Sequence, residues 1–169
     1  MHLVETMPDL ELHVLVDSIP QLQLLEAHGE RRPPARRLNV LLEVGVAGGR
    51  TGCRTVDEAM QVARAVAASR SVRLAGVECF EGLSVTGDSD ADRIVVERWM
   101  HAVQQVARQC DAEGLFGTAE VTLSAGGSAV FDLVARSLPT LLSRPVRTIL
   151  RSGCYVTHDS HFYERFARH

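Results

Sequence analysis

Residues 38–69 read LNVLLEVGVAGGRTGCRTVDEAMQVARAVAAS, and this stretch decides the fold. Its first part, Leu38–Val44, is nearly all apolar, as expected of a parallel strand that is covered on both faces. A glycine-rich turn follows, and Thr55–Ser69 has the spacing of an amphipathic helix with a capping box from Thr55 to Glu58. Strand, turn and helix in this order form one unit of a parallel βα fold.

The same unit recurs along the chain, so the sequence predicts either a doubly wound sheet or a (β/α) barrel. A closed eight-stranded barrel takes about 250 residues, whereas this chain has 169 residues and about five strands. We see no internal boundary and treat residues 1–169 as one domain. The remaining predicted strands are Leu12–Asp17, Val72–Cys79, Ala119–Ser124 and Val146–Leu150, and the remaining predicted helices are Ser18–His28, Ala91–Glu113 and Ser128–Leu138.

Bulk properties exclude several classes of function. The net charge of −3 gives no attraction to nucleic acid or to an anionic membrane surface. The longest apolar runs, such as Val40–Val44, are far too short to span a bilayer, and the N-terminus has no secretory signal pattern. The cysteines, Cys53, Cys79, Cys110 and Cys154, show no CxxC spacing, which favours free thiols in a reducing cytoplasm. We therefore expect a cytoplasmic protein with neither nucleic acid nor membrane as its partner.

The chain contains no lysine. All 18 residues counted as Lys+Arg are arginine. A preference for arginine codons in a GC-rich genome explains this at surface positions. Whatever its cause, the absence leaves no side-chain primary amine that can form a Schiff base or act as a lysine base.

A first motif follows the strand Leu38–Val44 and runs to Gly52, with Arg50 near its end. Ligand sites of α/β proteins lie at this end of a strand, but the glycine spacing is not that of the dinucleotide fingerprint. Two interpretations are open. Arg50 is a solvated residue of a glycine-rich turn, or it pairs with a carboxylate, a phosphate or a ring nitrogen.

A second motif, Ser124–Ser128 (SAGGS), lies between a strand and a predicted helix. Gly126 and Gly127 would let a ligand approach the backbone closely, and Ser128 with the first N–H groups of the helix suits a phosphate. The alternative is that Ser128 only caps the helix. In a barrel, the loop after the next strand would lie beside this one, so Gly153 and Tyr155 could complete the same phosphate cup.

Other reactive residues near the C-terminus have simpler explanations. His158 and His161 have no nearby set of carboxylates or cysteines, so we predict surface histidines and no metal site. Cys154 has no identifiable activating partner, so we predict a partly buried structural thiol.

Taken together, four segments resemble the D-threonine aldolase/D-serine dehydratase-like family, a branch of the alanine racemase N-terminal-domain fold. They are VLLEVGVAGGRTGC, GVECFEG, SAGGSAVFD and LRSGCYVTHD, in this order. The resemblance covers residues 12–163, and the third and fourth segments are the specific ones. It is closest to bacterial amino acid deaminases or aldolases.

The resemblance implies a pyridoxal-phosphate barrel. Members of the family carry the Schiff-base lysine on the first barrel strand and have a C-terminal β domain. Neither segment is recognisable here, so the chain resembles a fragment: a partial TIM-type barrel of about five parallel strands without a catalytic lysine. By resemblance, Glu78 and Glu81 are weaker candidates for lining the pocket, Arg50 would lie near the cofactor ring or the substrate carboxylate, and the phosphate would be held by Gly126, Gly127, Ser128, Gly153 and Tyr155.

We therefore expect part of a pyridoxal-phosphate lyase, an aldolase or deaminase of small hydroxy D-amino acids, that is inactive alone. The alternative is a non-catalytic module for a phosphate ligand, or one half of a split barrel that a partner chain completes. An incomplete barrel has two unpaired strand edges, which favour self-association or a complementary barrel half. It should also leave apolar inner side chains of strands such as LNVLLEV and AEVTLS exposed to water.

Overall fold

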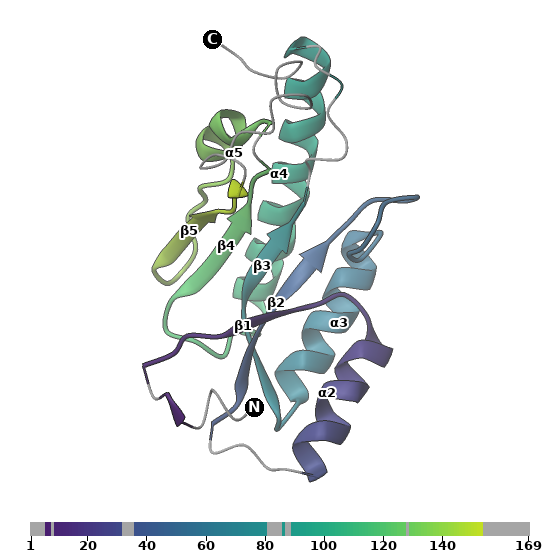
Figure 1. The fold of residues 1–169 in the computed structure, drawn as a ribbon, viewed down its shortest axis with the longest axis vertical. Coiled ribbons are helices and arrows are strands. Elements are labelled where there is room, and N and C mark those ends of the chain that lie inside the picture. Colours follow the sequence, from purple (N-terminus) through teal and green to yellow (C-terminus); the bar gives the residue numbers. More distant parts are fainter. Residues whose placement is uncertain are drawn as a thin grey trace.

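The computed structural model describes residues 6–7, 9–31, 36–80, 86, 89–127 and 129–153. In this part of the chain, strands and helices alternate (Figure 1). Most predicted elements differ from the observed ones by one to three residues at an end. The elements are β1 (His13–Val16), α2 (Ile19–Arg31), β2 (Leu38–Val44), α3 (Val56–Ala68), β3 (Val72–Cys79), α4 (Ser89–Ala112), β4 (Val121–Ala125), α5 (Phe131–Ser137) and β5 (Val146–Leu150).

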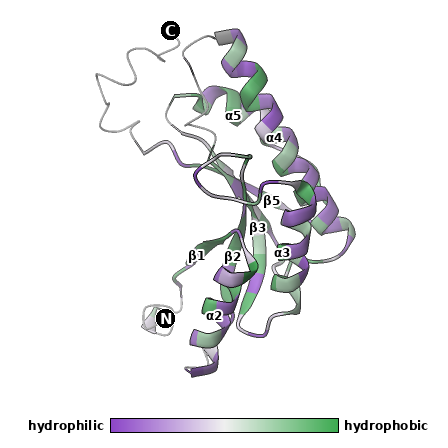
Figure 2. Ribbon diagram, turned by 90° about the vertical axis from the view of Figure 1, so that its right-hand side faces the viewer, coloured by the Kyte–Doolittle hydropathy of each residue, from purple (hydrophilic) through white to green (hydrophobic). Residues whose placement is uncertain are grey.

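The five strands form one parallel sheet in the order β1-β2-β3-β4-β5. Each strand therefore pairs with the strand that precedes it in the sequence, as in a (β/α) barrel. Helices α3, α4 and α5 lie along one side of the sheet (Figures 1 and 2). The predicted fold class, a partial α/β barrel of five parallel strands, is confirmed.

Alternation along the strands separates an apolar core from a more polar face. On β2, the residues Leu38, Val40, Leu42 and Val44 point toward the helices and belong to the main core. The same face of the sheet carries Leu74 and Val77 from β3 and Leu123 from β4. Helix α3 covers it with a stripe of buried residues, namely Ala59, Met60, Val62, Ala63 and Val66.

The expected exposure of apolar residues in β2 and β4 is wrong. Val40, Leu42 and Leu123 are fully buried, and Leu41, which points away from the helices, is only 5% exposed. The opposite face avoids a large apolar surface because most of its side chains are polar. In and directly beside the strands, the exposed large apolar residues belong to the edge strands β1 and β5 or adjoin them, namely Leu12, Leu15, Ile149 and Leu150.

The sheet curves strongly across its width. Arg147 lies in the edge strand β5 and Glu11 lies two residues before the opposite edge strand β1, yet Arg147 Nη1 lies 2.7 Å from Glu11 Oε2. Arg147 Nη2 also lies 2.6 Å from Glu120 Oε2. One ion pair therefore joins the two edges across the concave face, as the curvature of a barrel allows.

A β-bulge at Ala75 shifts the register between β2 and β3 by one residue. Val40 pairs with Leu74, whereas the next residue, Leu41, pairs with Gly76. Gly76 then lies so close to β4 that a Cβ atom would come within 1.8 Å of the Thr122 carbonyl oxygen. Only glycine permits this approach of β3 to β4.

Helix α5 differs from its prediction. It begins at Phe131, and its N-cap is Val130, whose side chain makes no capping hydrogen bond. The interpretation that Ser128 caps this helix is therefore wrong; Ser128 itself lies outside the described residues. At α3 the predicted cap is confirmed, since the Glu58 amide donates to Thr55 Oγ1 at 3.1 Å. The Glu58 carboxylate, however, accepts from the amide of Arg54 rather than from that of Thr55.

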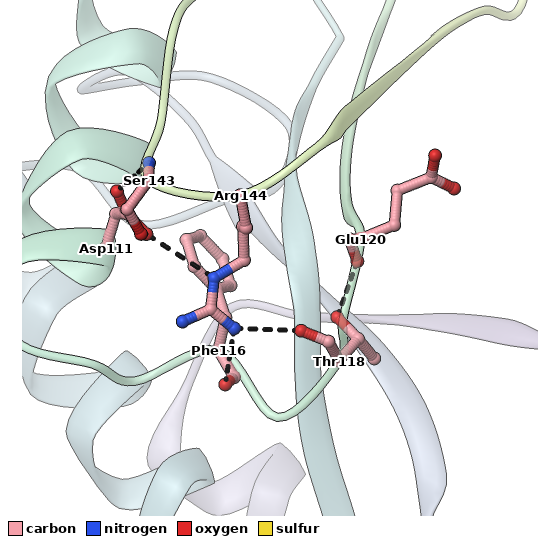
Figure 3. A network of polar contacts seen from close by, with 6 residues as sticks. All are labelled: Asp111, Phe116, Thr118, Glu120, Ser143 and Arg144. Atoms are coloured by element: carbon pink, nitrogen blue, oxygen red, sulfur yellow. Dashed lines mark hydrogen bonds and ion pairs between the residues drawn. The ribbon is translucent and has the colours of Figure 1, made fainter.

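Arg144 joins three segments at the amino ends of β4 and β5 (Figure 3). Its Nη1 donates to the carbonyl oxygens of Thr118 at 2.8 Å and Phe116 at 3.3 Å, and its Nε lies 3.5 Å from Asp111 Oδ1. The Asp111 carboxylate also accepts from the amide and the hydroxyl of Ser143, both at 2.7 Å. The amide hydrogen bond from Ser143 is the main cause that lowers the pKa of Asp111.

Replacement of Arg144 by methionine should lower the free energy of unfolding by about 1.5–3 kcal/mol, because two backbone carbonyls lose this charged donor and the Asp111 carboxylate loses its ion pair. Urea denaturation measures this change. Arg93→Met is the matched control, since it breaks only an exposed pair with Glu97 and should cost less than about 0.5 kcal/mol. Equal effects of the two variants would show that the network contributes little to stability.

Candidate functional site

A concavity of about 470 Å³ lies on the polar face of the sheet. Its volume is in the range of small-molecule sites. Residues from β1 to β5 all contribute to it, so the curvature of the sheet shapes it. Its lining consists of Glu11, His13, Leu15, Leu41, Glu43, Arg50, Glu78, Phe80, Ser124, Arg147, Ile149 and Arg151.

Three polar side chains form a row across neighbouring strands near their carboxyl ends. Glu43 pairs in register with Glu78, and Glu78 with Ser124. All three are buried, with exposures of 7%, 0% and 2%. Buried carboxylates require partners, and the structure provides them from loops that follow the strands.

Arg151 is the partner of Glu78. Its Nη1 lies 2.5 Å from Glu78 Oε2, and its Nη2 donates to the Cys79 carbonyl oxygen at 2.7 Å. Arg151 directly follows β5, so this ion pair fixes the start of the loop after β5 against β3. Glu43 accepts a hydrogen bond from the hydroxyl of Thr51, a neighbour of Arg50 in the loop after β2.

Sequence reasoning missed Glu43 and Arg151 as site residues. The signal for Glu43 was present: LLEV and GVEC each carry one glutamate in an otherwise apolar strand end. A charged residue in such a strand points to a buried polar role. Arg151 had no comparable signal, because its partner is 73 residues away in the sequence.

Arg50 reaches the same concavity from the loop after β2. Its Cζ lies 4.9 Å from the centre of the Phe80 ring, a cation–π distance. Its side chain makes no ion pair with a carboxylate among the described residues, whereas Arg147 and Arg151 both do. Its N–H donors are therefore available to an anionic ligand.

The structure brings the two predicted glycine loops side by side. Gly126 and Gly127 follow β4, and the neighbouring strand β5 leads into residues 151–153. The amide of Arg151 donates to the Ala125 carbonyl oxygen at 3.1 Å, so the two strands remain paired up to these loops. Gly126 has a φ of +106°, a conformation that favours glycine. Gly153 is exposed at the same edge, and a Cβ there would meet no atom within 4 Å.

The remaining predicted residues are of two kinds. Ser128, Tyr155, Glu81, Cys154, His158 and His161 lie outside the described residues. Cys53 and Cys110 are buried thiols, and burial is the main cause that raises the pKa of each to about 12. They are therefore unreactive structural residues.

At the other end of the concavity, the floor carries Glu11, His13 and Arg147. The hydrogen bond from Arg147 lowers the pKa of Glu11, and burial lowers the pKa of His13.

In the part of the chain that the structure describes, no helix is long and apolar enough to cross a membrane.

Comparison with known proteins finds both similar sequences and similar structures. The 3-hydroxy-D-aspartate aldolase of Paracoccus denitrificans (strain Pd 1222) is 26% identical over 124 residues, which cover 73% of this chain and 31% of that protein. The crystal structure of D-threonine aldolase from Filomicrobium marinum is similar with a TM-score of 0.69 and 21% identity, over 93% of this chain and 39% of that one.

D-threo-3-hydroxyaspartate dehydratase from Delftia sp. HT23 is similar with a TM-score of 0.59 and 23% identity, over 89% of this chain and 37% of that one. The chain thus spans 31–39% of the length of these relatives. The family model described as alanine racemase, N-terminal domain, matches residues 2–164. The resemblance inferred from the sequence is confirmed at this level, and the chain belongs to the alanine racemase N-terminal domain family.

Proposed function

We propose that this chain is the cofactor-holding part of a pyridoxal-phosphate lyase that acts on small hydroxy D-amino acids as an aldolase or dehydratase. The observation that carries the proposal is the convergence at one edge of the sheet. The loop after β2 brings Arg50, which makes no ion pair among the described residues, to the concavity, and the strands add two buried carboxylates. The two glycine loops follow the neighbouring strands β4 and β5 at the same edge of the sheet.

The residues present fit pyridoxal phosphate. The cofactor has an anionic phosphate and a flat ring, and the concavity is large enough for a ligand of that size. Gly126 and Gly127 carry no side chain that would obstruct a phosphate near the backbone, and a Cβ at Gly153 would meet no atom within 4 Å. Arg50 supplies a cation that no described carboxylate neutralises.

Roles for this chain's own residues follow from these contacts. Gly126, Gly127 and Gly153 would hold the phosphate, with Ser128 and Tyr155 added by family resemblance. Arg50 would bind the cofactor ring or the substrate carboxylate. The Glu78–Arg151 pair would keep the loop after β5 in register with the loop after β4. When bound, the cofactor supplies an electron sink for the carbanion formed from the amino acid.

The substrate class comes from the relatives, whose names refer to D-threonine and to hydroxyaspartates of the D series. These are small amino acids with a hydroxyl group on Cβ. Because the chain spans only part of these proteins, its substrate and the choice between cleavage and dehydration belong to the proposal.

The absence of lysine favours a second candidate, a non-catalytic module that binds a phosphate ligand without covalent attachment. Both candidates need the same glycine loops. They differ in whether the chain works with a lysine-bearing barrel half, so the following experiments separate cofactor binding from covalent chemistry.

Mixed with pyridoxal phosphate, the chain should form no stoichiometric covalent adduct at an internal site, because it has no lysine. The measurement is borohydride reduction, digestion and mass spectrometry. Labelling of the α-amino group serves as an internal reference for nonspecific reaction. One internal pyridoxyl site at full occupancy would contradict the prediction.

Gly127→Val and Arg50→Met should each weaken non-covalent binding of pyridoxal phosphate about tenfold or more. The valine side chain would block the approach of the phosphate, and the methionine would remove a charge-assisted donor. Trp99, the single tryptophan, lines the same small pocket as Arg50, so quenching of its fluorescence should report binding. The matched control Arg108→Met, on the far part of α4, should bind like the wild type.

In the same titration, pyridoxal without phosphate tests the glycine loops separately. It should bind weakly to the wild type and should be insensitive to Gly127→Val. If it binds as tightly as the phosphorylated form, the phosphate-cup assignment fails. Tight binding of inorganic phosphate with no gain from the pyridine ring would favour the second candidate.

We also expect the purified chain to self-associate or to bind a complementary barrel half, because β1 and β5 are unpaired edge strands in the described part. Sedimentation velocity should show a sedimentation coefficient that rises with protein concentration. Binding of a dye for apolar surface should stay low, since the concave face is mainly polar. A monodisperse monomer at all concentrations would contradict this expectation.

A further inference from the structure

The loop that carries Arg50, residues 45–53, is closed at its base; we call it the arginine loop. The amide of Gly45 donates to the Cys53 carbonyl oxygen, and the amide of Cys53 donates to the Glu43 carbonyl oxygen, both at 2.8 Å. Val44 and Cys53 form a parallel bridge. The chain therefore leaves the end of β2 and returns to it before α3 begins.

Two glycines make this closure possible. A Cβ at Gly45 would lie 2.2 Å from the Thr51 carbonyl oxygen, and a Cβ at Gly52 would lie 2.4 Å from the Gly45 amide nitrogen. Gly52 also has a φ of +90°. Its amide donates to Asp17 Oδ2 at 2.9 Å, which ties the loop to the end of β1. These contacts fix the base of the loop. Closer to its tip, the Gly49 amide donates to the Val46 carbonyl oxygen at 2.9 Å and the Thr51 hydroxyl donates to the Glu43 carboxylate, and Arg54 adds two further hydrogen bonds.

Arg54 holds the tip. A single nitrogen, Arg54 Nη1, donates to the carbonyl oxygens of Val46 at 2.9 Å and Thr51 at 2.8 Å. These two carbonyls lie on either side of Arg50 along the loop. We call these two hydrogen bonds from Arg54 Nη1 the clamp. The amide of Arg54 donates to Glu58 Oε2 at 2.7 Å, so a residue of α3 holds Arg54 in place.

The effect of the clamp is to order the tip of the loop. The loop contains four glycines, at positions 45, 48, 49 and 52, and glycine-rich segments lose much conformational entropy when they are fixed. A loop that is ordered before binding avoids this cost at the moment of binding. Arg50, whose guanidinium lies over the Phe80 ring, would then lose less conformational entropy when it binds a ligand.

We propose that Arg54 is a positioning residue that holds the arginine loop so that Arg50 can bind an anionic group of the ligand. The inference rests on the proposed function, because it assumes that Arg50 contacts the cofactor or the substrate. It adds that the contact depends on a second arginine that lies under the loop rather than in the concavity.

The test uses Arg54→Met, Arg54→Lys and the control Arg108→Met. Hydrogen exchange without ligand should show the amides of the arginine loop exchanging at least about tenfold faster in Arg54→Met, because two charge-assisted hydrogen bonds are lost. The affinity for pyridoxal phosphate should fall about tenfold. Because one nitrogen reaches both carbonyls, Arg54→Lys should restore most of the protection and most of the affinity.

Several results would overturn the inference. They are unchanged loop exchange in Arg54→Met, unchanged affinity for pyridoxal phosphate despite faster exchange, or a loss of affinity that Arg54→Lys does not restore. Arg54→Met could melt at a much lower temperature than Arg108→Met. In that case Arg54→Gln takes the place of Arg54→Met in the same comparison, because its shorter neutral side chain also loses the clamp.

Failure of the proposed function has a different signature. In that case the wild type does not bind pyridoxal phosphate, or Arg50→Met binds it equally well. Loop exchange, measured without ligand, still decides whether Arg54 orders the loop. Faster exchange in Arg54→Met, with rescue by lysine, then shows that Arg54 orders the loop but not that it serves this ligand, and unchanged exchange rejects even the ordering of the loop.

Discussion

The alternation of side chains along parallel strands is the constraint on which the structure depends. Successive residues of a strand point to opposite faces, so β2 sends Val40 and Leu42 into the helix-covered core and Leu41 and Glu43 into the concavity. The same alternation holds on β4 and, beyond the bulge at Ala75, on β3, where Ser124 and Glu78 continue the polar row. Because all strands are parallel, their carboxyl ends meet at one edge, where the ligand-binding loops begin.

The buried carboxylates connect this sheet to its loops. Glu78 and Glu43 are nearly inaccessible to water, and each takes its partner from a loop after a different strand. An acid held in this way stabilises the loop as much as the loop stabilises the acid, since breaking either contact leaves a buried charge with fewer partners. The polar row thus serves both as part of the site wall and as an anchor for its rim.

Much of the fold followed from the sequence, because LNVLLEV and the capped helix after it give unambiguous local signals. The bounds of β2, β3 and β5 were predicted correctly because each of these strands is a short, mainly apolar run. The start of α5 was not, because serine is a residue type that often caps helices, so Ser128 favoured an early start, whereas the helix begins at Phe131 after the N-cap Val130. The concavity was predicted only in part. Arg50 and the glycine loops have recognisable motifs, but the Glu78–Arg151 pair depends on the register between distant strands.

The strand order also determines how the chain can fold during synthesis. Each strand pairs with the one made just before it, so the sheet can grow one βα unit at a time as the polypeptide leaves the ribosome. The Glu11–Arg147 contact is an exception, because it joins residues 136 positions apart. Contacts of such long sequence separation carry a high loop-closure cost until the intervening structure has formed. The contact that joins the two edges of the sheet can therefore form only after β5 has been made.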